Sequence, residues 1–263
     1  MRKGFSLVEL SIVLVILGLL VGGILAGRSL IRASELRSVG TEYAQYRTAV
    51  ASFRDKYFAL PGDMTNATNF WGPAANCPGT NADTTAAVVA TCNGNGDDVL
   101  RPNAVTANEW FRFWQHLANA GMVEGSYIGV ADSTSYNGEA ATIGWNVPAS
   151  KLANAGWSAG RANDRDITDT SYFEGTYGNL LVFGAKNAVT WSSAAVLTPA
   201  EAWNIDTKLD DGKPGTGRAF VPENRANSCH DQSTSTTVPL AEIANYLLTN
   251  TNIACPLFFR RSF

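Results

Sequence analysis

Two acidic stretches contain the side chains of this sequence that could bind a metal ion. In the first, Asn93, Asn95 and Asp97 place oxygen ligands at alternate positions, as the beginning of an EF-hand calcium loop does. The bidentate Glu that such a loop needs at its twelfth position is missing, because Ala104 stands there. A solvated Asn/Gly turn explains the same residues, so calcium binding at this loop is a hypothesis with a simple structural alternative.

The second stretch carries three carboxylates, Asp206, Asp210 and Asp211. Together with backbone carbonyl groups they could hold calcium, a hard cation that prefers oxygen ligands. The alternative is the end of a helix followed by a Gly/Pro turn, in which Lys208 and Lys213 partly neutralise the acids. Both interpretations stay open, and calcium is the cofactor that these residues suggest.

The cysteines form no Cys-x-x-Cys pair, so the clustered ligand set of a structural zinc site is missing. An even number of cysteines in an exported chain is typical of disulfides, and four cysteines allow three connectivities. Loop-closure entropy favours the bonds that are local in sequence. We therefore expect Cys77–Cys92 and Cys229–Cys255.

Motifs of catalysis are missing from the sequence. It has no Gly-x-Ser-x-Gly, no Walker loop and no His-Glu-x-x-His. His230 and Asp231 could do acid–base work, but they adjoin Cys229, and a cysteine in a disulfide is not a nucleophile. The net charge is −3 without any block of Lys or Arg, which disfavours nucleic acid as a partner. We expect a protein that is not an enzyme.

The N-terminal stretch carries one charge where a charge is costly. Residues 5–27 form an apolar run in which Glu9 is the one charged residue, and a helix of this length spans a bilayer core. A carboxylate inside a span costs about 3 kcal/mol and marks a functional position, unless it lies close enough to the interface to reach water. Residues 1–4 form a basic leader, which predicts that the N-terminus stays cytoplasmic.

The segment Lys3-Gly4-Phe5-Ser6-Leu7-Val8-Glu9-Leu10 resembles the signal of type IV prepilins and type II secretion pseudopilins: a basic leader, Gly, Phe, then Glu four positions after the Phe. The resemblance covers residues 2–30. It implies cleavage after Gly4 by a prepilin peptidase, N-methylation of Phe5, and pairing of Glu9 with the cationic N-terminus of a neighbouring subunit. The Pro that many major pilins carry near the position of Ala26 is absent, so the filament subclass stays open.

The same resemblance implies a location and partners. The chain would sit in the inner membrane as a single-pass protein and then join other pilin or pseudopilin subunits, through an inner-membrane assembly platform, in a periplasmic or cell-surface filament. Removing 4 of 263 residues leaves 259, more than a typical major pilin has, which favours a minor or specialised subunit. The alternative is a DNA-uptake or surface-adhesion pilin with a ligand-binding head. Related pseudopilins bind calcium through acidic loops, and the stretch from Asp206 to Asp211 resembles such a loop.

These residues need a long helix and a folded head to position them. After the leader (1–4) and the transmembrane half of the helix (5–27), we expect an amphipathic half (28–59) and a globular head (60–263). The amphipathic half is indicated by apolar residues at alternating spacings of three and four: Leu36, Val39, Tyr43, Tyr46, Val50, Phe53 and Tyr57. The Pro61-Gly62 pair then ends the helix.

In the head, we expect two helices with capping boxes, over residues 106–121 and 198–209, and buried strands over 177–183 and 253–259. Of the aromatic residues in 110–114, we expect most in the core, and a minority could form an exposed contact patch. The order of these elements predicts an α+β, type IV pilin-like fold, with the long N-terminal helix packed on a C-terminal head that contains an antiparallel sheet.

Overall fold

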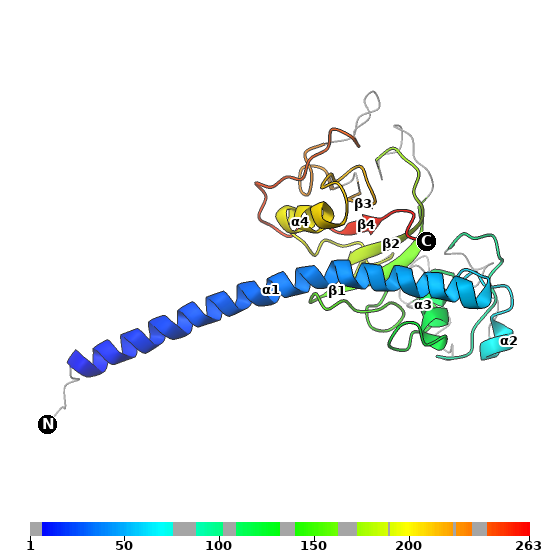
Figure 1. The fold of residues 1–263 in the computed structure, drawn as a ribbon, viewed down its shortest axis with the longest axis horizontal. Helices are drawn as coiled ribbons and strands as arrows, with labels where there is room; N and C mark the ends of the chain where they lie inside the picture. Colours follow the sequence, from blue (N-terminus) through cyan, green and yellow to red (C-terminus); the bar gives the residue numbers. More distant parts are fainter. Residues whose placement is uncertain are drawn as a thin grey trace.

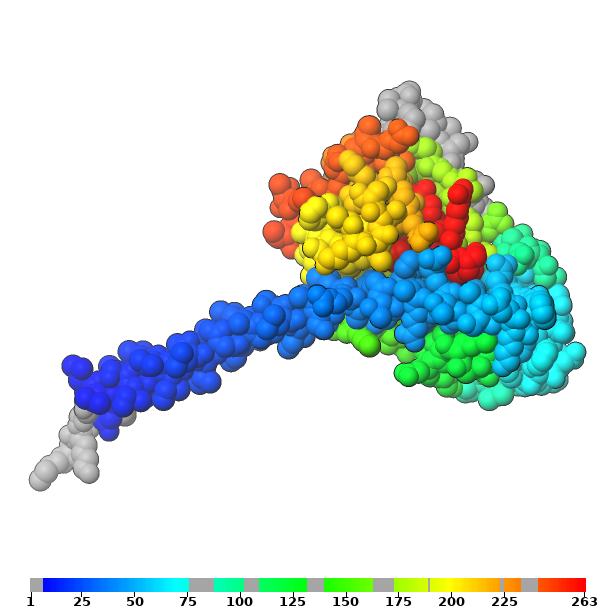
Figure 2. Space-filling model, in the orientation of Figure 1, coloured from blue at the N-terminus to red at the C-terminus, as the bar shows by residue number. Residues whose placement is uncertain are grey.

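A long helix and a mixed head make up the computed structural model, which describes residues 7–75, 88–101, 109–131, 140–162, 173–188, 190–222, 225–232 and 241–263. Helix α1 (Leu7–Tyr57) has 51 residues, about 77 Å at 1.5 Å per residue, and its first half projects away from the head (Figures 1 and 2). The other elements, in chain order, are α2 (Thr68–Trp71), α3 (Glu109–Asn119), β1 (Ala155–Ala162), β2 (Gly178–Ala185), α4 (Pro199–Leu209), β3 (Ala219–Phe220) and β4 (Leu257–Phe259).

Helix α1 has two halves with different surroundings. From Leu7 to Ile31, each large apolar side chain is at least half exposed. Further along, the predicted stripe is buried at Val39, Tyr43, Tyr46, Val50 and Phe53. Leu36 and Tyr57 pack against the same core from its rim. The helix ends at Tyr57, two residues before the predicted end, because Phe58 adopts a left-handed conformation (φ 53°).

The head is built on an antiparallel sheet of order β1-β2-β4-β3. Its face receives the buried stripe of α1: the ring of Tyr43 stacks on Phe259 at 4.3 Å, and that of Tyr46 meets Trp157 edge-on at 5.6 Å. This arrangement confirms the predicted α+β class. The predicted last strand, 253–259, is wrong in length, because β4 begins only at Leu257, directly after Pro256, which has no N–H for a ladder.

Helix α3 corrects the expected exposed aromatic patch. Its four aromatic residues between 110 and 114 are all buried. Trp110 stacks on Trp191 at 4.8 Å, Trp114 meets Tyr46 edge-on at 4.9 Å, and Phe113 stacks on Phe263 at 5.0 Å. The rings point in different directions, but α1, the C-terminal residue and the segment around Trp191 cover the helix from those sides. No contact patch remains on these rings.

Candidate functional site

The first functional position is Glu9, in the first turn of α1. Its side chain is exposed among apolar side chains that are exposed as well. Among the described residues, α1 is the one helix long and apolar enough to cross a membrane. A surface of this kind is stable in lipid or in a bundle of similar helices, and costly in water.

A second carboxylate on α1, Glu42, is buried and bound to the head. Its Oε2 accepts hydrogen bonds from the Ser150 hydroxyl (2.6 Å) and from the Trp157 indole N–H (2.7 Å). Its Oε1 accepts one from the backbone N–H of Lys151 (2.8 Å). Three donors satisfy this buried charge, and all of them come from β1 or the segment before it.

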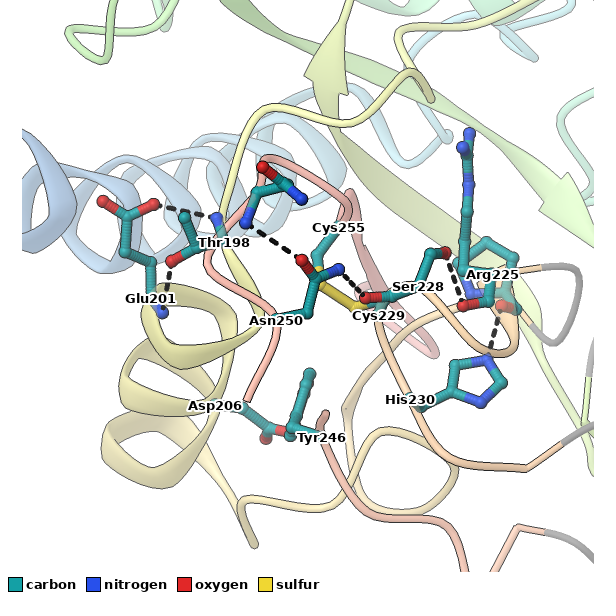
Figure 3. The surroundings of a disulfide bond; sticks show 12 residues. Thr198, Glu201, Asp206, Arg225, Ser228, Cys229, His230, Tyr246, Asn250 and Cys255 are labelled. Carbon is teal, nitrogen blue, oxygen red and sulfur yellow. Dashed lines mark hydrogen bonds between the residues drawn. A yellow bond between two sulfur atoms is a disulfide. The ribbon is translucent and has the colours of Figure 1, made fainter. Parts of the chain in front are cut away.

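Where α1 leaves the head, Arg32 holds the beginning of α4. Its Nε and Nη2 donate to the two carboxylate oxygens of Glu201 at 2.6 and 2.9 Å. Glu201 is also the third residue of the capping box that Thr198 and Pro199 open, as predicted (Figure 3). Burial alone would raise the pKa of Glu201, but hydrogen bonds from Arg32 and Thr198 outweigh it and lower that pKa.

The predicted acidic cluster comes together at the end of α4. One carboxylate oxygen from each of Asp206, Asp210 and Asp211 lies within 4.8 Å of the others. Asp206 is fully buried, and its Oδ2 accepts a hydrogen bond from the Tyr246 hydroxyl at 2.9 Å (Figure 3). Its Oδ1 is buried without a hydrogen-bond partner in the described chain. Burial, followed by the charges of Asp211 and Asp210, raises the pKa of Asp206 to about 8.

The two exposed acids of this cluster already hold the turn that follows. Asp210 Oδ2 accepts hydrogen bonds from the backbone N–H groups of Arg218 and Ala219. Asp211 accepts from the backbone N–H of Lys213 (2.9 Å) and the hydroxyl of Thr216 (2.6 Å). A buried carboxylate beside two further carboxylates offers the oxygen ligands that suit a hard divalent cation.

Comparison with known proteins finds a family match at the N-terminal end of the chain, which includes the first part of α1. Residues 1–25 match the family described as the prokaryotic N-terminal methylation motif. The chain carries the type IV pilin and pseudopilin signal. No curated protein and no solved structure matches the chain. The signal and the apolar helix together support a pilin-like or pseudopilin subunit that a prepilin peptidase processes and that is anchored in a membrane before assembly.

The pilin-like head contains the predicted disulfide Cys229–Cys255 (Figure 3). The two Cα atoms are 5.3 Å apart, and the bond ties the segment 225–232 to the chain just before β4. Cys92 is also in a disulfide, while Cys77 lies outside the described residues. His230, the acid–base candidate of the sequence, is buried, and its Nε2 lies 3.2 Å from the carbonyl oxygen of Pro222.

The asparagine loop has a function in the fold that sequence analysis missed. The backbone N–H groups of Asn95, Gly96 and Asp98 all donate to the carboxylate of Asp63, at 3.1, 2.6 and 2.7 Å. The loop thus wraps around an anion that belongs to the chain, directly after α1 ends. The position of Asp63 behind Pro61-Gly62 was the one local signal, but its partners lie more than thirty residues away.

The proposed calcium ligands of this loop accept backbone hydrogen bonds as well. The side-chain oxygens of Asn93, Asn95 and Asp97 accept from the N–H groups of Thr68, Asp97 and Val99, respectively. The contacts of Asn95 and Asp97 are typical of Asx turns, whereas that of Asn93 ties the loop to the start of α2. Ala104, at the twelfth position, lies outside the described residues. Calcium binding at this loop therefore stays a prediction.

Proposed function

We propose that this protein is a structural subunit of a helical filament, a type IV pilus or a type II secretion pseudopilus. The observation that carries the proposal is the division of α1. The half that bears the prepilin signal exposes its apolar side chains, and the half that follows is buried on the head. Parallel packing of exposed halves from many subunits would cover that apolar surface and leave the heads outside.

Glu9 fits this assembly by a simple electrostatic argument. Cleavage after Gly4 creates an amine at Phe5, and in a bundle of apolar helices an unpaired ammonium and an unpaired carboxylate are both costly. Pairing Glu9 of one subunit with the amine of the next offsets that cost in one axial register only. The carboxylate would thereby select the stagger of the filament. The size of the head favours a minor or specialised subunit.

The test is to express the chain with a prepilin peptidase and a filament-assembly system, and to shear the cells. We expect the sheared fraction to contain a chain that starts at Phe5 and carries one added methyl group by intact-mass measurement. Gly4→Leu is the control, because bulk before the scissile bond should block cleavage. That variant should stay in the membrane fraction with residues 1–4 attached. A wild-type chain that keeps residues 1–4, or is cut beyond Gly27, would contradict the proposal.

We also propose that Asp206, Asp210 and Asp211 bind calcium, together with backbone carbonyl groups. The support is the fully buried carboxylate of Asp206, which lies beside the two other acids. Bound calcium would neutralise the like charges and stabilise the head by mass action. Thermal unfolding of the full chain in detergent should shift upward with millimolar calcium and return with chelator. A response that survives in Asp206→Asn would place calcium elsewhere.

A further inference from the structure

The end of β4 and the start of β3 bring three arginines together. Arg260 and Arg261 follow the last residue of β4, and Arg218 precedes the first residue of β3. Because Ala219 pairs with Phe259 in the antiparallel register, the arginines on both sides of this pair are neighbours. The backbone N–H of Arg260 donates to the carbonyl oxygen of Arg218 at 2.9 Å. The pairing of β3 with β4 therefore holds these three arginines close together although their positive charges repel each other.

These arginines line one cavity of about 390 Å³ at this edge of the sheet. The other residues that line it are Thr176, Asp210 and Gly217. Asp210 is the one carboxylate among them, and its Oδ2 accepts hydrogen bonds from the backbone N–H groups of Arg218 and Ala219. The lining thus has three positive charges against the negative charge of Asp210, and Asp211 beside it adds a second negative charge nearby.

Arg260 is held in place before any ligand arrives. Its guanidinium carbon lies 5.0 Å from the ring centre of Tyr177 and 5.0 Å from that of Phe220, and its Nη2 donates to the carbonyl oxygen of Gly215 at 2.7 Å. Its Nε is buried without a hydrogen-bond partner in the described chain. A guanidinium that is stacked and fixed in this way loses little entropy on binding, which is the usual setting for recognition of carboxylate or phosphate.

We propose that this cavity is a binding site for the oxyanion group, carboxylate or phosphate, of a small ligand. Arg218 and Arg261 are exposed and can close on the anion, while Arg260 forms the fixed wall. The site lies in the head, and none of the residues that line it belongs to α1, the helix that we propose assembles the filament. It would give the filament a ligand-binding head, as the surface-adhesion alternative requires.

The experiment uses the full chain in neutral detergent at low salt, titrated by calorimetry with inorganic phosphate in one arm and with glucuronate, a sugar carboxylate, in the other. We expect saturable binding, with one ion per chain, of at least one probe, and the arm that binds identifies the group that the site prefers. The double variant Arg218→Gln/Arg261→Gln should raise the Kd of that probe about tenfold or more, because it removes the charge-assisted hydrogen bonds that the two arginines would donate to the anion.

A matched control removes the same charge at a distance. Arg37 and Lys151 are exposed and do not line the cavity, so Arg37→Gln/Lys151→Gln should leave the Kd unchanged. In chelator, which keeps calcium from neutralising the neighbouring acids, Asp210→Asn should act in the opposite direction and tighten binding, because the amide oxygen can still accept the two backbone N–H groups while the repelling charge is gone. Absence of saturable binding in both arms would overturn the proposal. So would equal loss in the control, or unchanged binding in Arg218→Gln/Arg261→Gln.

Discussion

Glu9 and Glu42 are carboxylates on the same helix, about 50 Å apart along its axis, and their surroundings differ completely. Glu42 is buried, and three donors of the head satisfy it. Glu9 is exposed among apolar side chains that no part of the described chain covers. A buried charge is stable only when it is paired, and Glu42 meets this condition within its own chain.

The difference indicates what each half of α1 contributes. The partners of Glu42 belong to the same chain, so Glu42 should determine the stability of the head. The partner that we propose for Glu9 belongs to another chain and arises only on processing, so Glu9 should determine assembly. Each of the following changes tests this separation.

Glu42→Ala should have the largest effect on folding. It leaves the Ser150 hydroxyl, the Lys151 N–H and the Trp157 indole N–H without their acceptor, and each such loss costs about 1–3 kcal/mol. We expect the free energy of unfolding to fall by about 3–5 kcal/mol in chemical denaturation of the full chain in detergent. Thr48→Ala, on the exposed face of the same helix, is the control and should cost less than about 1 kcal/mol. If Glu42→Ala also lowered the free energy of unfolding by less than about 1 kcal/mol, the packing of α1 on the head would not depend on the hydrogen bonds of Glu42.

Removing the disulfide with Cys229→Ser/Cys255→Ser should lower the free energy of unfolding by about 3 kcal/mol, because the bond closes a loop of 26 residues. Both cysteines are fully buried in the head, far from the exposed half of α1. Membrane insertion, measured by fractionation, should therefore stay at the wild-type level. Loss of the protein from the membrane, with the head still folded, would break the separation between the two halves.

A smaller effect is expected from pH, which should change the stability of the head in one direction through the acidic cluster. The pKa of Asp206 is raised to about 8 in the folded chain, so between its ordinary value and pH 8 the folded state binds more protons than the unfolded state. The free energy of unfolding should therefore fall as pH rises from about 5 to about 8, and this group should add no further change above that. In chelator, Asp206→Asn should gain stability relative to wild type over that range. A stability difference that is constant with pH would show that Asp206 titrates normally.

Arg32→Gln tests the boundary between the halves and should have the smallest effect. Its ion pair with Glu201 is partly exposed, and such pairs contribute about 1 kcal/mol or less. The capping box of α4 stays intact, because Thr198 and Glu201 still bond each other. We expect a slight loss of stability, together with faster amide hydrogen exchange at the start of α4. Unchanged exchange there would mean that Arg32 does not hold α4.

Much of this arrangement follows from local sequence patterns. The stripe on α1 is readable because its apolar residues recur with the helical period, and the start of α4 is readable because Thr198, Pro199 and Glu201 form a capping box. Strand β1 cannot be predicted in this way, because its sequence, AGWSAGRA, lacks the β-branched residues and the alternation that indicate a strand. The glycine at position 160 is required by long-range packing, because a Cβ there would collide with the rings of Trp191 and Trp110.

The site residues divide in the same way. The prepilin signal and the proximity of Asp210 to Asp211 are local, so the sequence predicts them. The burial of Asp206 depends on Tyr246, forty residues away, and the three arginines meet only through the pairing of β3 with β4. The anchor at Glu42 depends on donors more than one hundred residues later. Contacts of this range arise from topology, which periodicity and spacing do not encode.

The most direct test of the central claim compares Glu9→Gln with Glu42→Gln, two variants with the same change on one helix. For each we would measure the amount in sheared filaments relative to the membrane fraction, and the thermal unfolding of the purified full chain. Glu9→Gln should insert normally and unfold at the wild-type temperature, yet be depleted from filaments several-fold. Glu42→Gln should unfold at a lower temperature. Wild-type incorporation of Glu9→Gln would contradict the proposal that this carboxylate pairs between subunits.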